Sequence, residues 1–240
     1  MSALSHAWWW LLDYLYAGRR QLAALAPPWP RHGLRAEPRA WARGRATLPD
    51  VVLLPGVYEH WTFLRPLGDA LNDAGFRVRV VHGLGANRRS VGDSAERVAR
   101  ALATTAAPAA GRVIVAHSKG GLIGKQLLVA EADKPLGLRG MVTVCTPFGG
   151  SRLATLFRAP SIRAFSPTDA TILALGRASS VNARIVSVFG RYDPHIPEGS
   201  VLIGATNVEV ATHGHFRLLG SPLTHRAVIE GIGSLPAAPG

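Results

Sequence analysis

The sequence predicts a doubly wound α/β fold with a mostly parallel sheet, and two observations support this class. From residue 50 onward, short runs rich in β-branched residues alternate with segments of helical periodicity, a pattern typical of parallel βαβ units. The short runs are apolar almost throughout, as strands are when helices cover both faces of their sheet. With 240 residues, 48% of them hydrophobic, the chain can bury one substantial core.

The same alternation places the elements in order along the chain. Strands are expected at residues 51–54, 76–81, 112–116, 138–145, 184–189 and 207–211. Helices are expected at residues 60–74, 91–105, 119–132 and 222–232. The interval between the fourth and fifth strands is long enough for a short helical cap at about residues 150–182. Ligands of such sheets bind beyond the carboxyl ends of the strands, where a cap or lid would cover them.

Residues 1–26 are predicted to form a separate amphipathic helix. Its apolar face consists of Trp8, Leu11, Leu12, Leu15 and Leu22, and Asp13 and Arg20 lie opposite. The apolar run is too short to span a membrane and lacks the basic start of a signal peptide. Two interpretations stay open, namely a helix in a membrane interface and a brace packed on the domain. We therefore expect a cytoplasmic protein, with peripheral contact at the inner membrane surface under the first interpretation.

Residues 27–49 are rich in proline and arginine, and they are predicted to form an extended or irregular connector over the surface. Residues 50–240 then form the α/β domain. Across the chain, Lys plus Arg number 27 and Asp plus Glu 15, which gives a net charge of +12. The arginines are scattered, and no stacking aromatic residues alternate with them, so nucleic acid is not an expected partner.

The content of cysteine, histidine and carboxylate residues predicts neither a metal nor a cofactor. Histidines and carboxylates do not cluster at ligand spacing, and no glycine-rich phosphate loop opens a helix. The single cysteine, Cys145, lies in an apolar strand and is interpreted as an inert buried thiol, in keeping with a reducing compartment.

Ser118 follows the third predicted strand, in the run Ala116-His117-Ser118-Lys119-Gly120-Gly121. A strand, a sharp turn with serine at its apex and a helix together raise the hydroxyl clear of the backbone. Small residues are needed at positions 116 and 120, because strand and helix nearly touch there. Amide N–H groups at a helix start can bind an oxyanion, and the Lys119 N–H is the first candidate. The Lys119 side chain is expected to be solvated.

A serine nucleophile needs a base, and the base needs a carboxylate that fixes its tautomer. Asp193 follows the fifth predicted strand and His215 follows the sixth, which gives the chain order serine, aspartate, histidine. His213 is the alternative base, and Glu198 is the alternative acid.

The loop after the first predicted strand supplies a second candidate donor for an oxyanion. Gly56 lets that loop turn sharply, which leaves the Val57 N–H free to point at a ligand. His117 and His195 flank the candidate site in the sequence, and both are expected to line it.

Four separated motifs at these positions resemble those of the α/β-hydrolase superfamily, in particular its bacterial lipase and esterase branch. They are Leu-Pro-Gly-Val-Tyr at 54–58, Ala-His-Ser-Lys-Gly-Gly at 116–121, Thr-Pro-Phe-Gly-Gly-Ser at 146–151 and Gly-His-Phe at 214–216. The resemblance covers about residues 50–235. The chain departs from the family at Ala116, where glycine is usual, and at Pro55 and Phe148, where histidine is common. None of these departures removes a catalytic group.

The resemblance implies Ser118 as nucleophile, His215 as base and Asp193 as orienting acid, with Val57 and Lys119 as oxyanion-hole residues. The leading hypothesis is a serine hydrolase that cleaves carboxylic esters, including lipid-like ones, through an acyl-enzyme. An acyltransferase or thioesterase would use the same nucleophile, since fold does not decide the acceptor. A third hypothesis is a catalytically silent protein that binds a membrane or a partner on this scaffold.

Overall fold

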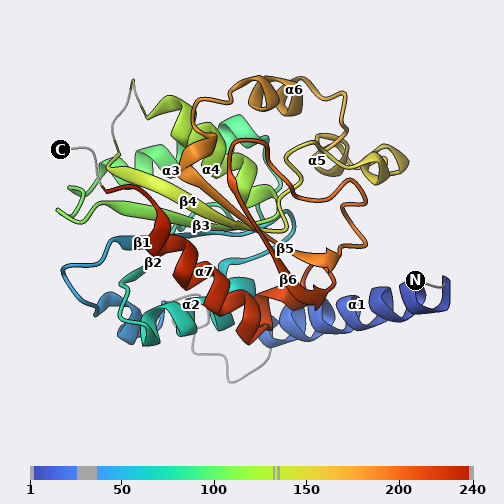
Figure 1. The fold of residues 1–240 in the computed structure, drawn as a ribbon, viewed down its shortest axis with the longest axis horizontal. Helices are drawn as coiled ribbons and strands as arrows, with labels where there is room; N and C mark the ends of the chain where they lie inside the picture. Colours follow the sequence, from blue (N-terminus) through green and yellow to red (C-terminus); the bar gives the residue numbers. More distant parts are fainter. Residues whose placement is uncertain (1–2, 26–36, 132, 134–135, 238–240) are drawn as a thin grey trace.

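The computed structural model describes residues 3–25, 37–131, 133 and 136–237, and its centre is a six-stranded sheet (Figure 1). The strands lie in the order β2-β1-β3-β4-β5-β6, and all neighbouring strands are parallel. They are β1 (Asp50–Leu54), β2 (Val78–Val80), β3 (Arg112–His117), β4 (Leu138–Val144), β5 (Ile185–Tyr192) and β6 (Thr206–His213). The predicted fold class is confirmed.

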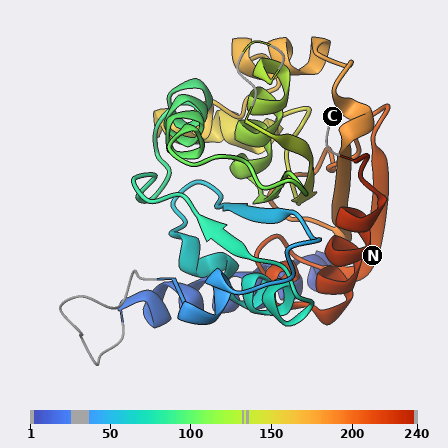
Figure 2. The same cartoon turned by 90° about the vertical axis from the view of Figure 1, so that its left-hand side faces the viewer.

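Helices cover both faces of the sheet, and the view along the sheet separates the layers (Figure 2). On one face lie α2 (Arg65–Asp73) and α7 (Pro222–Ser234), and on the other lie α3 (Val91–Ala103) and α4 (Lys119–Ala130). Between β4 and β5 the chain forms short helical segments above the strand ends. These are the 3₁₀ turn Arg152–Leu156, α5 (Pro160–Arg163), α6 (Ala170–Arg177) and the 3₁₀ turn Asn182–Arg184.

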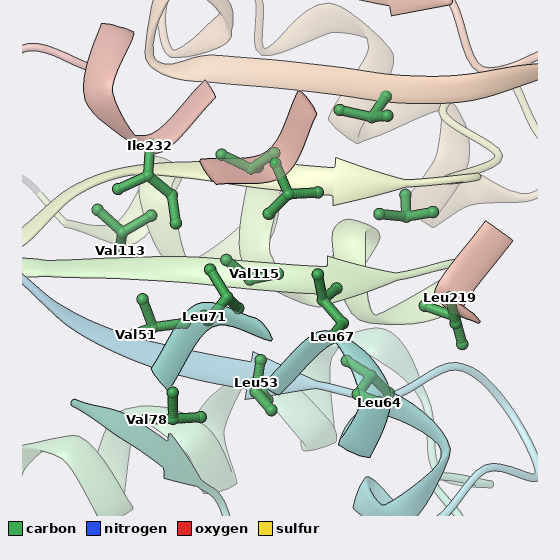
Figure 3. Packing of buried hydrophobic residues seen from close by; sticks show 14 of the residues in the cluster. Val51, Leu53, Leu64, Leu67, Leu71, Val78, Val113, Val115, Leu219 and Ile232 are labelled. Carbon is green, nitrogen blue, oxygen red and sulfur yellow. The ribbon is translucent and has the colours of Figure 1, made fainter. Parts of the chain in front are cut away.

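The alternation of side chains along each strand divides the core into two layers. Val51 and Leu53 of β1 point to the same face as Val113 and Val115 of β3, where they meet α2 and α7 (Figure 3). The intervening residues of these strands belong to the layer under α3 and α4. Because both faces are buried here, both sets of positions are apolar along most of β1 and β3, whereas the edge strand β6 is polar and largely exposed.

The predicted surface connector, residues 27–49, lies partly outside the described residues. Most residues of its described part are exposed, and Trp41 is an exception. Trp41, in the 3₁₀ turn Arg39–Ala42, is 1% exposed and packs edge-on against Trp61. Its Nε1–H donates to Asp69 Oδ1 at 2.9 Å. A buried indole with a satisfied N–H contributes to stability, so Trp41 fastens this segment to the core.

The N-terminal helix α1 (Ala3–Leu25) packs against the domain (Figure 1). Asp13 is fully buried, and the Arg20 guanidinium donates to the carbonyl oxygen of Thr62. Trp9 stacks on His213, and Tyr16 packs against the core. The exposed side of the helix carries Trp8, Leu11, Leu15 and Leu22, each at least half exposed. The helix therefore contacts the domain and leaves most of its predicted apolar face exposed. No helix in the described ranges is both long and apolar enough to cross a bilayer.

Candidate active site

Ser118 occupies a sharp turn between β3 and α4. Its φ of 51° and ψ of −120° lie outside the regions that non-glycine residues prefer. The turn is held by the Ser118 N–H, which donates to Val144 O at 2.9 Å. A Cβ at Gly120 would lie only 2.2 Å from Leu54 O, so the close approach of α4 to β1 requires glycine there. Sequence and geometry therefore agree on a strained turn that presents a serine.

Asp193 and His215 meet beyond the carboxyl ends of β5 and β6. His215 Nδ1 lies 2.7 Å from Asp193 Oδ2, and both side chains are about 5% exposed. Asp193 Oδ1 accepts hydrogen bonds from the backbone N–H groups of His195 at 2.8 Å and Ile196 at 3.2 Å. With both carboxylate oxygens engaged, the acid is fixed in orientation. It can hold His215 in the tautomer that has Nδ1 protonated and Nε2 free.

The protonation state of His215 reflects two opposing effects. Burial lowers the pKa of its imidazole, and this effect outweighs the neighbouring Asp193 carboxylate, which raises it. The net pKa is below the ordinary value, so the ring is neutral at neutral pH and its Nε2 can accept a proton.

Ser118 and His215 both line one cavity of about 490 Å³, a size typical of small-molecule sites. In the described part of the chain no hydrogen bond joins the two side chains. Such bonds are often long before a substrate binds. The remaining wall is largely apolar and comes from α1, the cap and the loops after β1, β5 and β6. It includes Trp10, Tyr14, Val57, Leu153, Phe157, Ile162, Phe165, Ile196 and Phe216.

Two candidate N–H donors border this cavity. Val57 is among its lining residues, and Lys119 is the first residue of α4, where a backbone N–H has no acceptor within the helix. The loop that carries Val57 is closed by Glu59, whose Oε2 accepts from the Gly56 N–H at 2.7 Å. The loop also reaches the cap, because Tyr58 Oη lies 2.7 Å from Ser161 Oγ.

The Lys119 side chain corrects the expectation of a solvated amine. It is 2% exposed, and its Nζ donates to the carbonyl oxygens of Asn87, at 2.8 Å, and of Arg89. The loop before α3 lies across the start of α4 and supplies these acceptors. Burial lowers the pKa of this amine to about 8. The side chain therefore fastens a loop and does not face the cavity.

His117 also differs from its expectation, because it lies beneath the site and does not line it. It is fully buried, with Nδ1 2.8 Å from Glu59 Oε1 and Nε2 3.2 Å from the carbonyl oxygen of His215. Both neighbours are acceptors, so both ring nitrogens must donate. Burial by itself would lower the pKa of His117, but the charge of Glu59 and these hydrogen bonds outweigh it and raise the pKa. These surroundings favour the imidazolium form of the ring beside a buried carboxylate.

The other candidates occupy different environments. His195 lines the cavity as expected, with its ring centroid 5.0 Å from that of His215. His213 stacks on Trp9 at 4.3 Å. Glu198 accepts from the backbone N–H of Arg152 at 3.1 Å. Of the two candidate bases, His215 is therefore the one whose ring contacts Asp193. Of the two candidate acids, Asp193 is the one that contacts His215 Nδ1.

Cys145, Asp193 and His215 bring possible ligand atoms within 4.8 Å of one another. The set does not fit a metal ion, because Asp193 has both oxygens engaged in hydrogen bonds and uses one of them to hold His215. Burial and the Asp193 charge raise the pKa of Cys145 well above its ordinary value. The sulfur therefore stays a thiol, whereas metals bind the thiolate. This environment agrees with the interpretation of Cys145 as a buried thiol.

Sequence patterns do not reveal two buried carboxylates beside this site, Asp13 and Glu59. Each depends on contacts between segments far apart in the chain. A single acidic residue within the aromatic and aliphatic run of α1 is the one local signal for Asp13, and it also fits a solvated helix face.

Neither a protein-family model nor a curated protein sequence matches the chain. Solved structures, in contrast, match it. The mature lipase BlEst2 of Bacillus licheniformis is 13% identical with a TM-score of 0.65, over 79% of this chain and 94% of the lipase. Lipase B of Aspergillus fumigatus is 17% identical with a TM-score of 0.67, over 82% of this chain and 55% of that one. A membrane phospholipase A is 14% identical with a TM-score of 0.52, over 92% of each chain. The chain therefore has the α/β-hydrolase fold, which it shares with these bacterial and fungal lipases.

Proposed function

We propose that the protein is a serine hydrolase that cleaves carboxylic esters through an acyl-enzyme on Ser118. The observation that carries the proposal is the 2.7 Å contact between His215 Nδ1 and Asp193, with Ser118 and His215 lining one cavity. In this assignment Ser118 is the nucleophile, His215 the base and Asp193 the orienting acid. The backbone N–H groups of Val57 and Lys119 form the oxyanion hole.

Acylation begins when Ser118 Oγ bonds to the ester carbonyl carbon while His215 Nε2 takes the hydroxyl proton. The carbonyl oxygen becomes an oxyanion, which the two backbone N–H groups stabilise. A single donor of this kind typically lowers the activation barrier by about 3–4 kcal/mol. When the carbonyl re-forms, the alkoxide leaves with the proton from His215. Water then repeats the sequence at the acyl-enzyme, releasing the acid and restoring Ser118.

The cavity wall favours esters of apolar acids. It holds an acyl chain against aliphatic and aromatic side chains of the cap, such as Ile162 and Phe165, and burying each methylene contributes about 0.8 kcal/mol. The lipases and esterases among the structural neighbours agree with this substrate class.

Labelling with a fluorophosphonate probe tests the nucleophile. We expect the native chain to react and Ser118→Ala to be inert. Ser151→Ala is the matched control, because Ser151 is another serine that lines the same cavity. Labelling that persists in Ser118→Ala would rule out the mechanism, and an unreactive native chain would favour a silent binding protein. Incubating an ester with an added alcohol then separates hydrolysis from acyl transfer by the product formed.

We further propose that the outer face of α1 contacts a lipid surface. Trp8, Leu11 and Leu15 are 50–60% exposed there, and an apolar helix face with aromatic residues suits the headgroup region of a bilayer. On the cap, Leu156 and Phe157 are also exposed, and Arg158 and Arg163 line a neighbouring polar cavity. Trp10, Tyr14 and Phe157 line the ester cavity itself, so both surfaces border its entrance. The arginines and the net charge of +12 favour anionic lipid.

Vesicle flotation tests this contact. The double variant Leu11→Ser, Leu15→Ser should lose binding to vesicles that contain phosphatidylglycerol, and it should still hydrolyse a soluble short-chain ester. Leu173→Ser is the control, because Leu173 is an exposed apolar residue of α6. Equal flotation of the native chain and the double variant would contradict the proposal. A change from monomer to dimer in the native chain that the double variant abolishes would instead assign the face to a second copy.

A further inference from the structure

Asp13 is a buried carboxylate that the N-terminal helix brings to the edge of the candidate active site. It is fully buried, whereas Trp8, Leu11 and Leu15 of the same helix are exposed. Burying a carboxylate is costly unless hydrogen bonds and opposite charges compensate for the lost hydration. Its surroundings therefore indicate what the side chain does.

The carboxylate holds the backbone that follows His215. Asp13 Oδ1 accepts from the N–H groups of Phe216 at 2.9 Å and Arg217 at 3.0 Å. The contact is close enough that a Cβ at Gly214 would lie 2.5 Å from this oxygen. Gly214 has a φ of 115°, so both space and backbone conformation call for glycine there. The segment that carries His215 is thus fixed by a residue 203 positions away.

The second oxygen of Asp13 faces the histidines of the site. Oδ2 lies 3.6 Å from His195 Nε2, and neither atom has a hydrogen-bond partner among the described residues. The His195 ring in turn lies 5.0 Å from the ring of His215, centroid to centroid. A negative charge at Asp13 therefore favours the protonated form of His215.

The surroundings keep Asp13 ionised. Burial would raise its pKa, but the nearby imidazoles of His195 and His215 and the backbone N–H groups that it binds outweigh burial and lower it. The titratable groups that face it from the packed elements are His195, His215, Arg217, Cys145, Tyr14 and Tyr16. Of these, His215 is the group that takes up a proton in the proposed mechanism.

We propose that Asp13 is a positioning residue for His215: it anchors the backbone beside the base, and its charge stabilises the imidazolium that forms during turnover. Asp193 fixes the ring of His215 and Asp13 fixes the chain that carries it. The helix α1 is then part of the enzyme's working structure, which also explains why it buries a carboxylate against the domain. The role in turnover rests on the proposed serine hydrolase function.

Two substitutions at Asp13 separate the effect of its hydrogen bonds to the backbone from the effect of its negative charge. Asp13→Asn keeps an oxygen that can accept from Phe216 and Arg217 but removes the negative charge. We expect it to lower the pKa of His215, measured by NMR titration of the ring, and to shift the acidic limb of kcat/KM to lower pH. Asp13→Ala also removes the acceptor. We expect kcat to fall about 10- to 100-fold, as displacements of about 1 Å do, with KM changed by less than about threefold.

Asp73→Asn is the matched control, because Asp73 is an exposed aspartate at the end of α2, and it should change neither readout. If Asp13→Ala does not fold, Asp13→Asn decides the question. A folded Asp13→Asn with the native His215 pKa, or a folded Asp13→Ala with native kcat, would overturn the proposal. The NMR titration needs no ester turnover. A His215 pKa that shifts in a protein without esterase activity would therefore reject the hydrolase function and keep the Asp13–His215 coupling.

Discussion

Glu59 and His117 form a buried ion pair, with 2.8 Å between Oε1 and Nδ1, directly beneath the candidate site. Glu59 also binds the Gly56 N–H, and His117 also binds the carbonyl oxygen of His215. The pair thereby connects the loop that carries Val57, the residue before Ser118 and the backbone of the base. Three parts of the site that come from three strand ends are held in one arrangement.

Glu59→Gln should destabilise the protein strongly, because it leaves a buried imidazolium without its counter-charge. Breaking a buried pair in this way typically costs about 3–5 kcal/mol. Chemical denaturation at pH 6 measures the loss, and Glu96→Gln on the exposed face of α3 is the control. A change of the same size in both variants would contradict a special role for the pair.

The difference in unfolding free energy between the native chain and Glu59→Gln should change with pH in one direction. The pKa of His117 is raised in the folded state, so the folded protein holds this proton more tightly than the unfolded chain does. The stabilisation is complete below the unfolded value of about 6.5. It is lost as pH rises through the raised folded pKa. The difference in unfolding free energy between the native chain and Glu59→Gln should therefore shrink toward alkaline pH. A difference that stays constant from pH 5 to pH 10 would show that His117 is neutral.

Asp193→Asn should lower kcat by about 10⁴-fold, the loss seen when an amide leaves the catalytic imidazole in the wrong tautomer. Glu198→Gln tests the alternative acid and should leave kcat unchanged, because Glu198 pairs with Arg152 at 3.4 Å. Steady-state hydrolysis of a soluble ester by both variants gives the answer. A large loss of kcat in Glu198→Gln but not in Asp193→Asn would identify Glu198 as the acid.

The acidic limb of kcat/KM should fall below pH 6.5. Activity requires neutral His215, and burial keeps the pKa of this residue below its ordinary value of 6.5, so activity is lost only as pH falls through that lowered pKa. His213→Ala should keep the same limb, because that ring stacks on Trp9 outside the Asp193 contact, whereas His215→Ala should abolish turnover. An active His215→Ala variant would identify His213 as the base.

Local patterns sufficed to predict the sheet and the meeting of Asp193 with His215. Each of these residues lies within two positions of the end of a strand, and parallel strands bring their carboxyl ends to one edge. The contacts of Asp13, Glu59 and the Lys119 amine could not be predicted in this way. Their burial is offset by backbone donors and acceptors from distant loops, such as the N–H of Phe216 for Asp13, and residue polarity alone predicts solvation for all three.

Gly120→Ala should be severely destabilising, because the elbow has no room for a methyl group. The added Cβ would lie 2.2 Å from the backbone oxygen of Leu54, which cannot move without displacing β1 from its place between β2 and β3. Overpacking of this kind typically costs about 1–3 kcal/mol and more where backbone must shift. Gly176→Ala in α6 is the matched control, since nothing lies within 4 Å of its added Cβ, and a helical alanine should stabilise by about 1 kcal/mol. Thermal unfolding of the two variants measures the loss of stability in Gly120→Ala and the gain in Gly176→Ala. Equal stability of the two variants would mean that a methyl group at position 120 has more room beside Leu54 than the 2.2 Å separation implies.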